Sequence, residues 1–360
     1  MRNLRSKILF GADSIFKLQN MIAFKKYSSI ENTFDAEFLE KTRLETPENL
    51  EYVVQEKVHG ANFCIVTDGQ TVVAGKRTGL IEVGEKFYDH EELLERYKPK
   101  ALAMYAALKE KYPDTTTLTV FGEIFGGNYP HPDVKNDARI ICIQKGVHYC
   151  PNHEFYAFDL YLSNSETGRF LSVDESNLFF EKFAFIYAKT LFKGSLNECL
   201  NYPNQFPSLI SKWLGLPAID DNVCEGVVIR PTEVVYLHNG SRLLLKNKNA
   251  RFAEKKSVKK RQPRLLVEVS YSNVLTDLLE VTEEYVTENR LNNVISKIGE
   301  ISVPKDTGKL IGLFSKDILD DFLKEHSGKY AMLEKSEQKI LNRHINMQAT
   351  GLIKQVYLKM

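Results

Sequence analysis

Short apolar runs that end in glycine or in polar residues dominate the first two thirds of the chain. The runs at 52–58, 62–67 and 71–75 have the length and the β-branched content of strands, and Asp68-Gly69 between the last two is a typical hairpin turn. Further strand-like runs follow at 117–123, 155–162, 223–229 and 242–248. In the run at 155–162, strict alternation predicts that Phe158 and Asp159 face opposite sides.

Helical periodicity is found in three other stretches. Apolar residues recur at helical spacing over 91–111, where Pro99 predicts an interruption. Residues 172–217 are predicted to be mainly helical with loops, and 268–360 to be almost wholly helical. The breaks expected within the last stretch are Pro304 and Gly328.

These patterns predict an α+β protein with two domains. We expect a mixed domain of strands and helices over 21–255, a basic linker over 256–267, and a small helical domain over 268–360. Residues 1–20 are expected to be a leader, because four basic residues and one aspartate interleave with apolar residues there. This composition fits either an organellar presequence or a disordered leader that precedes a second start at Met21.

Charge and cysteine content restrict the class of protein only loosely. The 360 residues carry a formal charge of +1, so a nucleic-acid partner would have to be bound by local basic patches. The five cysteines form an odd set without a Cys-x-x-Cys pair, which favours reduced thiols and an intracellular location. Four possible zinc ligands lie close together in the sequence, although without the usual paired spacing: Cys142, His148, Cys150 and His153.

No apolar run approaches the roughly eighteen residues of a membrane span. We therefore expect no membrane partner, and a cytoplasmic location (the host cytoplasm for a viral protein) is favoured over a mitochondrial one.

The most informative stretch is the strand that ends in Glu56-Lys57-Val58-His59-Gly60. With a period of two, Lys57 and His59 face one side of the strand, and Glu56 and Val58 face the other. Gly60 allows another group to approach the backbone closely. A lysine desolvated at such a position can act as a nucleophile, although a surface lysine on an edge strand has the same local pattern.

Other strands also end in residues suited to phosphate or nucleotide chemistry. An arginine follows the 71–75 strand in Lys76-Arg77, and Gly122-Glu123 places a carboxylate at the end of an apolar strand. Phe158-Asp159, Glu225-Gly226 and the pair Lys246 and Lys248, which share one strand face, complete the series. Each signal alone is weak, but their order along the chain is informative.

In that order the motifs resemble those of the covalent nucleotidyltransferases, which include ATP-dependent DNA ligases, RNA ligases and mRNA capping enzymes. Within this superfamily, residues 56–63 resemble the phage double-strand-type RNA ligases and the trypanosome mitochondrial RNA-editing ligases, because His59 stands where DNA ligases and capping enzymes usually have aspartate. Residues 24–32 resemble the amino end of the phage ligase, and 289–300 its carboxy-terminal domain. The resemblance covers about 21–320.

The resemblance implies a nucleotidyltransferase fold and an ATP-dependent RNA ligase. Lys57 would take AMP from ATP and pass it to a 5′-phosphate RNA end. A 3′-hydroxyl of the adjacent RNA end would then displace AMP and seal the strand, with Mg²⁺ assisting. The partner would be RNA with these ends, in a duplex or bridged, in repair or editing. The enzyme would be a monomer.

The resemblance also implies roles for the other motif residues. Glu56 would read the adenine amine, Glu123 the ribose, and Phe158 would stack on the base. Asn62 and Arg77 would contact the phosphates or the RNA end, and Glu225 would hold a metal ion or orient the nucleophile. Lys246 and Lys248 would hold the α-phosphate, and His59 would act after Lys57 has taken up AMP. A core histidine bonded to backbone is the alternative for His59.

Contacts with RNA are implied for Arg230, Arg290 and Asp317. Arg230 stands where the phage ligase has lysine, and the other two match positions linked to RNA-end engagement. Ordinary helix-surface charge is the alternative for Arg290 and Asp317. The basic run 255–264 is either a solvated linker or an arm that contacts phosphates.

Three other functions share part of this pattern. A DNA ligase or capping enzyme would share the motifs, but DNA ligases usually carry an oligonucleotide-binding barrel after the last strand, where this chain is predicted to be helical. A non-catalytic RNA-binding relative would be expected to have lost motif residues, and a Schiff-base enzyme would not need the paired lysines.

Overall fold

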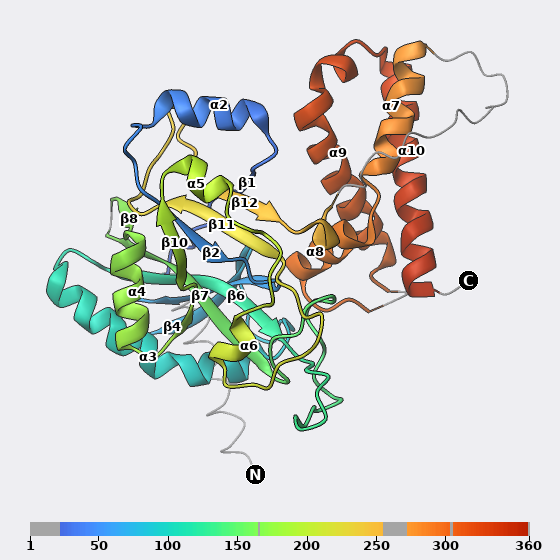
Figure 1. The fold of residues 1–360 in the computed structure, drawn as a ribbon. Helices are drawn as coiled ribbons and strands as arrows, with labels where there is room; N and C mark the ends of the chain where they lie inside the picture. The colour runs from blue at the N-terminus through green and yellow to red at the C-terminus, as the bar shows by residue number, and fades with distance from the viewer. Residues whose placement is uncertain (1–21, 165, 255–271, 303–304, 359–360) are drawn as a thin grey trace. The chain divides into compact units, whose positions relative to one another are not determined.

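The computed structural model describes residues 22–164, 166–254, 272–302 and 305–358, and the chain divides into two units, Met1–Arg251 and Phe252–Met360 (Figure 1). The division comes earlier than the sequence predicts, because the second unit already includes Ala253 and Glu254, whose carbonyl oxygens accept hydrogen bonds from Asn289 and Thr287. The predicted leader 1–20 and basic linker 256–267 lie outside the described residues.

Two sheets form the first unit. The first, sheet A, has the strand order β1-β12-β11-β2-β10. Its strands are β1 (Glu31–Asn32), β12 (Leu245–Lys248), β11 (Gly226–Pro231), β2 (Tyr52–Glu56) and β10 (Thr190–Gly194). Its outer face is apolar, with Val54, Ile229 and Leu245 packed against α2 (Ala36–Glu45) and α5 (Leu196–Leu200). The inner face is therefore left for the polar residues of β2, β11 and β12.

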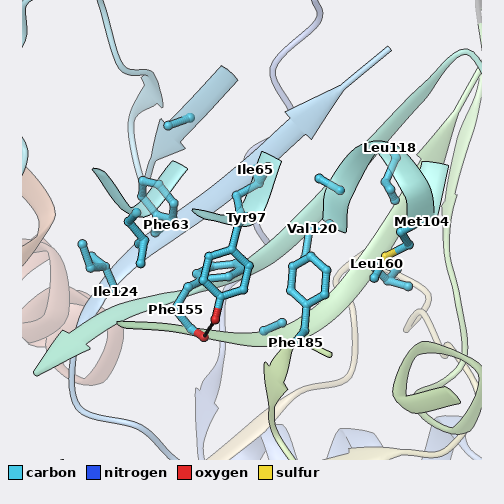
Figure 2. Close-up of a cluster of buried hydrophobic side chains, with 14 of the residues drawn as sticks. Phe63, Ile65, Tyr97, Met104, Leu118, Val120, Ile124, Phe155, Leu160 and Phe185 are labelled. Atoms are coloured by element: carbon cyan, nitrogen blue, oxygen red, sulfur yellow. Dashed lines mark hydrogen bonds between the residues drawn. The ribbon is translucent and has the colours of Figure 1, made fainter. Parts of the chain in front are cut away.

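Sheet B is antiparallel along the order β5-β4-β3-β6-β7-β8, and β9 pairs parallel with β7. Its strands are β5 (Gly79–Leu80), β4 (Val72–Lys76), β3 (Ala61–Thr67), β6 (Thr117–Gly126), β7 (His153–Ser163), β8 (Gly168–Phe170) and β9 (Ile186–Tyr187). Helices α3 (His90–Lys111) and α4 (Val173–Lys182) cover the outer face, where Figure 2 shows Phe63, Tyr97, Val120 and Phe155 in the largest core cluster.

A second apolar cluster fills part of the space between the two sheets. The N-terminal segment contributes Ile22 and Tyr27, and sheet B contributes Val66, Phe121 and Phe170. The segment then joins sheet A, since β1 pairs in parallel with β12. The layers thus run from helix to sheet A, to sheet B, to helix, and the first strand of the chain is fixed beside Lys246.

A β-bulge breaks the predicted alternation of β7. Phe121 of β6 is opposite Asp159, whereas Gly122 is opposite Ala157, so Phe158 has no partner of its own in the register. A bulge redirects the side chains that follow it. As a result, Asp159 contacts Tyr27 at the inner face, where Phe158 also packs, and the predicted opposition of Phe158 and Asp159 is wrong.

Two predictions of secondary structure are corrected. Helix α3 runs unbroken through Pro99, because one missing hydrogen bond is outweighed by the burial of Leu93, Tyr97 and Met104 against sheet B. The stretch 172–217, predicted mainly helical, also holds β9 and β10, and its last helix is the single turn α6 (Ile210–Trp213).

Every element of the second unit that the structure describes is helical. These elements are η1 (Ala250–Phe252), whose last residue begins the unit, then α7 (Asn273–Glu284), α8 (Glu288–Ile298), α9 (Thr307–Ala331), α10 (Lys335–Ile353) and η2 (Lys354–Leu358). Leu278, Phe314, Ile345 and their neighbours form its core. Helix α9 is kinked at His326 rather than at Gly328, whereas Pro304 lies outside the described residues.

Across the described ranges, none of the helices combines the length and the apolar character that crossing a bilayer requires.

Candidate active site

Lys57 lies directly beyond the end of β2, on the inner side of sheet A. Its backbone N–H donates to the Gly226 carbonyl oxygen at 2.9 Å, and Gly226 pairs with Lys248 of β12. Two positions back along the ladder, Gln55 of β2 pairs with Val228 and Val228 with Lys246. The register thus places Lys57 and Lys248 in one cross-strand line, and Lys246 two positions away on the same face of the sheet.

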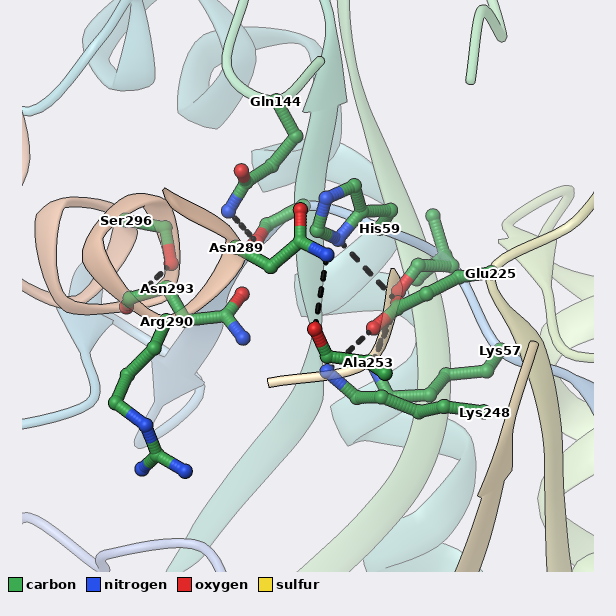
Figure 3. A network of polar contacts seen from close by, with 12 residues as sticks. Lys57, His59, Gln144, Glu225, Lys248, Ala253, Asn289, Arg290, Asn293 and Ser296 are labelled. Atoms are coloured by element: carbon green, nitrogen blue, oxygen red, sulfur yellow. Dashed lines mark hydrogen bonds and ion pairs between the residues drawn. The ribbon is translucent and has the colours of Figure 1, made fainter. Parts of the chain in front are cut away.

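Glu225 is the centre of the charged cluster. Its Oε2 lies 2.7 Å from Nζ of Lys57 and 3.4 Å from Nδ1 of His59, and its Oε1 lies 2.9 Å from Nζ of Lys248. Figure 3 shows these side chains directed at the carboxylate. Burial alone would raise the pKa of Glu225, but Lys248, Lys57 and His59 hold that pKa well below its usual range. The carboxylate therefore stays ionised and orients both lysines.

Glu123 supplies the second carboxylate, from β6 of sheet B. Burial raises the pKa of Glu123 to about 7, Lys57 opposes this shift, and Glu225 adds to it. Its Oε2 accepts a hydrogen bond from the Gly60 N–H at 2.9 Å. A Cβ at Gly60 would lie 2.4 Å from the Ile124 carbonyl oxygen, so only glycine fits against β6 here. The close approach that the sequence predicts at Gly60 is confirmed.

His59 and its turn are held by two residues that no sequence motif indicates, Tyr149 and Gln144. The backbone N–H of His59 donates to the buried Tyr149 hydroxyl at 2.8 Å, and Nε2 of Gln144 donates to the Gly60 carbonyl at 3.3 Å. Burial lowers the pKa of His59, although Glu225 opposes this shift. Tyr149 and Gln144 lie in an irregular segment after β6, without a periodic pattern that could have indicated their role.

A pocket opens beside this cluster between the two sheets. Phe158 forms part of its wall and packs on Tyr27, with ring centroids 4.9 Å apart. Gln55 and Ala188 form the wall on the sheet A side, where Nε2 of Gln55 donates to the Ala188 carbonyl at 2.5 Å. The aromatic face of Phe158, Lys57 and Glu123 thus line the same pocket.

Glu56 lines the same pocket, and its carboxylate is held by the segment that precedes α6. Its carboxylate accepts hydrogen bonds from the Ser208 hydroxyl at 2.6 Å and from the Leu209 N–H at 2.9 Å. Burial raises its pKa to about 7, and both of these bonds oppose the shift. Because neighbouring strand residues face opposite sides, the Glu56 side chain leaves β2 on the other side from Lys57, although Glu56 also lines the pocket. Its contact with the adenine amine stays a prediction.

A buried ion cluster occupies the other end of the pocket. Asp159 bonds Arg230 at 2.8 Å, Arg242 at 2.6 Å and the Tyr27 hydroxyl at 2.7 Å. Burial would raise the pKa of Asp159, but the two guanidinium groups lower it. Arg230 is buried in this cluster, and a phosphate contact would compete with Asp159. Arg77 donates to the Tyr27 carbonyl at 2.8 Å, and burial lowers its pKa.

Asn62 and Lys246 are half-buried strand residues near the same opening. Asn62 pairs with Glu123 across β3 and β6, and Lys246 pairs with Val228 and with Asn32 of β1. The first unit thus brings together Lys57, His59, Glu123, Glu225 and Lys248, with Asn62 and Lys246 in adjacent register positions. Their individual roles remain predictions.

Arg290 and Asp317 lie in the second unit, bonded to each other. Arg290 has 2% of its side chain exposed, and it donates to Asp317 at 3.1 Å, to Asp321 at 2.6 Å and to the Tyr285 carbonyl at 3.1 Å. Asp317 also pairs with the exposed Lys297 at 2.7 Å. Arg290 is thus buried rather than at the helix surface, and its contact with an RNA end stays a prediction.

The cysteines and histidines after β6 are separately bonded. His153 bonds Asp89 and the Ile141 carbonyl, while Cys142 and Cys150 donate to backbone carbonyls. In the parts of the chain that the structure describes, no group of three or more histidine, cysteine, aspartate or glutamate side chains could hold a metal ion.

Comparison with known protein families matches both units. Residues 50–248 match the RNA ligase family, and residues 269–350 match the family described as T4 RNA ligase 2 C-terminal. The chain belongs to the RNA ligase family. The expected α+β fold and the expected enzyme class are confirmed, and the helical carboxy-terminal unit is matched by an RNA ligase domain instead of a barrel.

Curated relatives of this ligase-family chain come from Trypanosoma brucei brucei. RNA-editing ligase 1, mitochondrial, is 28% identical over 363 residues, which is 85% of this chain and 77% of the relative. RNA-editing ligase 2, mitochondrial, is 25% identical over 349 residues, which is 84% of both proteins. The resemblance to the editing ligases is confirmed.

Solved structures of a Naegleria gruberi RNA ligase are also similar to the chain. A mutant with ATP and Mn has a TM-score of 0.42 and 13% identity, covering 64% of this chain and 58% of that one. The ligase with PPi has a TM-score of 0.41 and 15% identity, covering 64% and 57%. The match therefore spans a little over half the length of those solved chains.

Proposed function

We propose that this protein is an ATP-dependent RNA ligase that joins 3′-hydroxyl and 5′-phosphate RNA ends at nicks in duplex RNA, through AMP carried covalently on Lys57. The observation that carries the proposal is the ion cluster in which Glu225 holds Lys57 and Lys248 beside a pocket walled by Phe158. A lysine amine at this position can reach the phosphate of a bound nucleotide while the base of that nucleotide stacks on Phe158.

The first step is an in-line displacement at phosphorus. Nζ of Lys57 forms a bond to the α-phosphorus of ATP, the bond to the bridging oxygen breaks, pyrophosphate leaves, and the amine proton passes to solvent. Glu225 aims the amine, and Lys248 stands 2.9 Å from the other carboxylate oxygen, where it can neutralise charge on the α-phosphate. The protein's contribution is thus positioning and charge neutralisation, as is usual for phosphoryl-type transfers.

The next two steps repeat the displacement with RNA. An oxygen of the 5′-phosphate attacks the same phosphorus and releases the Lys57 amine, giving RNA with a 5′-5′ adenylate. The 3′-hydroxyl of the neighbouring strand then attacks the RNA phosphate, AMP leaves, and the hydroxyl proton is lost. Lys57 is free from the second step on, so we propose that Lys248, Lys246 and His59 carry the charge neutralisation in the last step.

The donor set fits a divalent cation bound together with nucleotide. Glu123 and Glu225 are close enough to raise the pKa of Glu123, and Mg²⁺ is commonly held by one or two carboxylates plus substrate phosphates. Glu225 would hold the ion, with Glu123 next to it. When bound, the ion would shield phosphate charge and favour the uncharged form of Lys57. A cation at this position would take the place of a lysine at Glu225.

The partner that fits this chemistry is RNA with a 5′-phosphate and a 3′-hydroxyl held side by side by a complementary strand. We propose that the enzyme is monomeric and intracellular, in the cytoplasm or in an organelle, since the trypanosome relatives are named as mitochondrial. Repair and editing both present such ends.

The decisive measurement is intact mass after incubation with ATP and Mg²⁺. The wild-type protein should gain the mass of one AMP, and Lys57→Ala should gain none. Lys86→Ala, which removes an exposed lysine between β5 and α3, is the matched control and should label like the wild type. AMP retained by Lys57→Ala would remove this lysine from the centre of the mechanism. Nicked duplexes of RNA and of DNA, supplied to labelled enzyme, then test the choice of substrate.

A further inference from the structure

The segment between α5 and α6 hydrogen-bonds to the ends of β12 and β2 and to Cys224, the residue before Glu225. It is an irregular stretch that runs from Pro203 to Leu209. Nδ2 of Asn204 donates to the carbonyl oxygen of Lys248 at 3.0 Å and to Oδ1 of Asn247 at 2.8 Å, both in β12. The segment is thereby attached to the backbone of one catalytic lysine.

Two residues further on, the same segment bonds the chain beside Glu225. The Phe206 carbonyl accepts the backbone N–H of Cys224 at 2.9 Å, and the Sγ of Cys224 donates to the Asn204 carbonyl at 3.5 Å. Cys224 is fully buried and is followed directly by Glu225. This second attachment fixes the start of β11.

The third attachment is to β2. Ser208 and Leu209 hold both oxygens of the Glu56 carboxylate, and Glu56 is the last residue of β2 before Lys57. Both Ser208 and Glu56 are buried, with 7% and 1% of their surfaces exposed. Alternate residues 204, 206 and 208 therefore contact β12, the chain just before β11, and β2 in turn.

The segment contacts the strands at their ends, where the charged residues of the cluster are located. β2 ends at Glu56, β12 ends at Lys248, and β11 begins at Gly226. Lys57 and Glu225 thus lie just beyond the regular ladder, and Lys248 is its last residue. Ladder hydrogen bonds alone hold strand ends weakly, while a displacement of about 1 Å can cost a hundredfold in rate.

We propose that the segment Asn204–Leu209 is a clamp that sets the spacing of Lys57, Glu225 and Lys248, with Asn204 and Ser208 as its positioning residues. Neither side chain needs to touch nucleotide or RNA. Asn204 acts through the backbone of Lys248, and Ser208 acts through the carboxylate of Glu56. This inference rests on the proposed function and adds to it two residues outside the nucleotidyltransferase motifs.

The test compares Asn204→Ala and Ser208→Ala with a matched control in the full-length protein. Asn201→Ala is the control, because Asn201 is exposed at the end of α5 and its Nδ2 bonds the Asn197 carbonyl without reaching a strand of sheet A. The rate of AMP attachment is measured against ATP concentration. We expect kcat to fall at least tenfold in both clamp variants, KM for ATP to stay within twofold, and the control to match the wild type.

A double-mutant cycle then tests the path through Glu56. If Ser208 acts by holding this carboxylate, Glu56→Gln combined with Ser208→Ala should lose little more than the stronger single variant. Multiplicative losses would overturn the Ser208 part of the proposal. Thermal melting of each variant separates positioning from folding. If Ser208→Ala does not fold, the half-buried Asn204 still decides the question.

The outcomes separate this inference from the proposed function. A wild-type protein that takes up no AMP contradicts the ligase proposal itself. A wild-type protein that labels normally, alongside clamp variants that equal Asn201→Ala, overturns only the clamp. A higher KM with an unchanged kcat would also overturn it, because it would place these residues in nucleotide binding.

Discussion

Replacing Glu123 by glutamine should make the ligand-free protein more stable at neutral and alkaline pH. Burial raises the pKa of Glu123 from 4.5 to about 7, so the folded protein prefers this carboxyl protonated. Such a group favours folding below its unfolded-state pKa, and this contribution is lost as pH rises through the folded-state value. Glutamine keeps an oxygen that can accept from the Gly60 N–H, and it removes the buried charge.

The size of this stability difference follows from the pKa shift of Glu123. At about 1.4 kcal/mol per pKa unit, ionising Glu123 lowers the free energy of unfolding by about 3 kcal/mol once the pH exceeds the folded-state pKa. Near pH 5 the same linkage gives a loss of just under 1 kcal/mol. The advantage of Glu123→Gln over the wild type should therefore grow by about 2.5 kcal/mol between pH 5 and pH 8.

Urea unfolding at the two pH values measures this difference. The only tryptophan, Trp213, belongs to the first unit, so its fluorescence reports on the unit that contains Glu123. Glu110→Gln, on the exposed face of α3, is the control and should show no pH-dependent gain. If the advantage of Glu123→Gln were the same at both pH values, burial would not be raising the pKa of Glu123, and the reasoning would fail.

Two further predictions concern the supports of the site. Asp159→Asn should lower the free energy of unfolding by about 3–5 kcal/mol, because it leaves two buried guanidinium groups without their carboxylate. Asp137→Asn, which breaks an exposed ion pair, is the control and should leave the urea midpoint unchanged. Equal midpoints for the two variants would contradict the buried cluster. Gly60→Ala should slow AMP attachment at least tenfold, because its Cβ would lie 2.4 Å from a backbone oxygen of β6. Gly312→Ala, whose Cβ meets open space in α9, is the control and should label normally. Normal labelling by both variants would refute the tight packing at Gly60.

The position of Lys57 could be predicted because the information is local. A period of two separates Lys57 from Glu56, and the glycine three residues after Lys57 indicates a close approach of another strand. Both conclusions need only nearby residues. The order of the motifs along the chain extended this prediction to Glu123, Glu225 and Lys248, whose proximity the structure supplies.

The supports of these residues could not be predicted, because their partners are distant in sequence. Ser208 and Glu56 are separated by 152 positions, and Tyr149 and His59 by 90. The bulge at Phe158 is equally invisible, since it arises from the register of β7 against β6. The interruption that Pro99 predicts is absent from α3 for the related reason that tertiary packing outweighs a local propensity.

The wide separation of Lys57 from Glu225, 168 positions along the chain, makes the site a test of completed folding. Neither residue can meet the other before β2 and β11 have paired, and contacts of such long range form late and slowly. A molecule that is misfolded or only partly assembled has no ion cluster to accept an adenylate. Covalent uptake of AMP would therefore count native molecules one by one, and it could follow refolding of the protein as a titration of its active fraction.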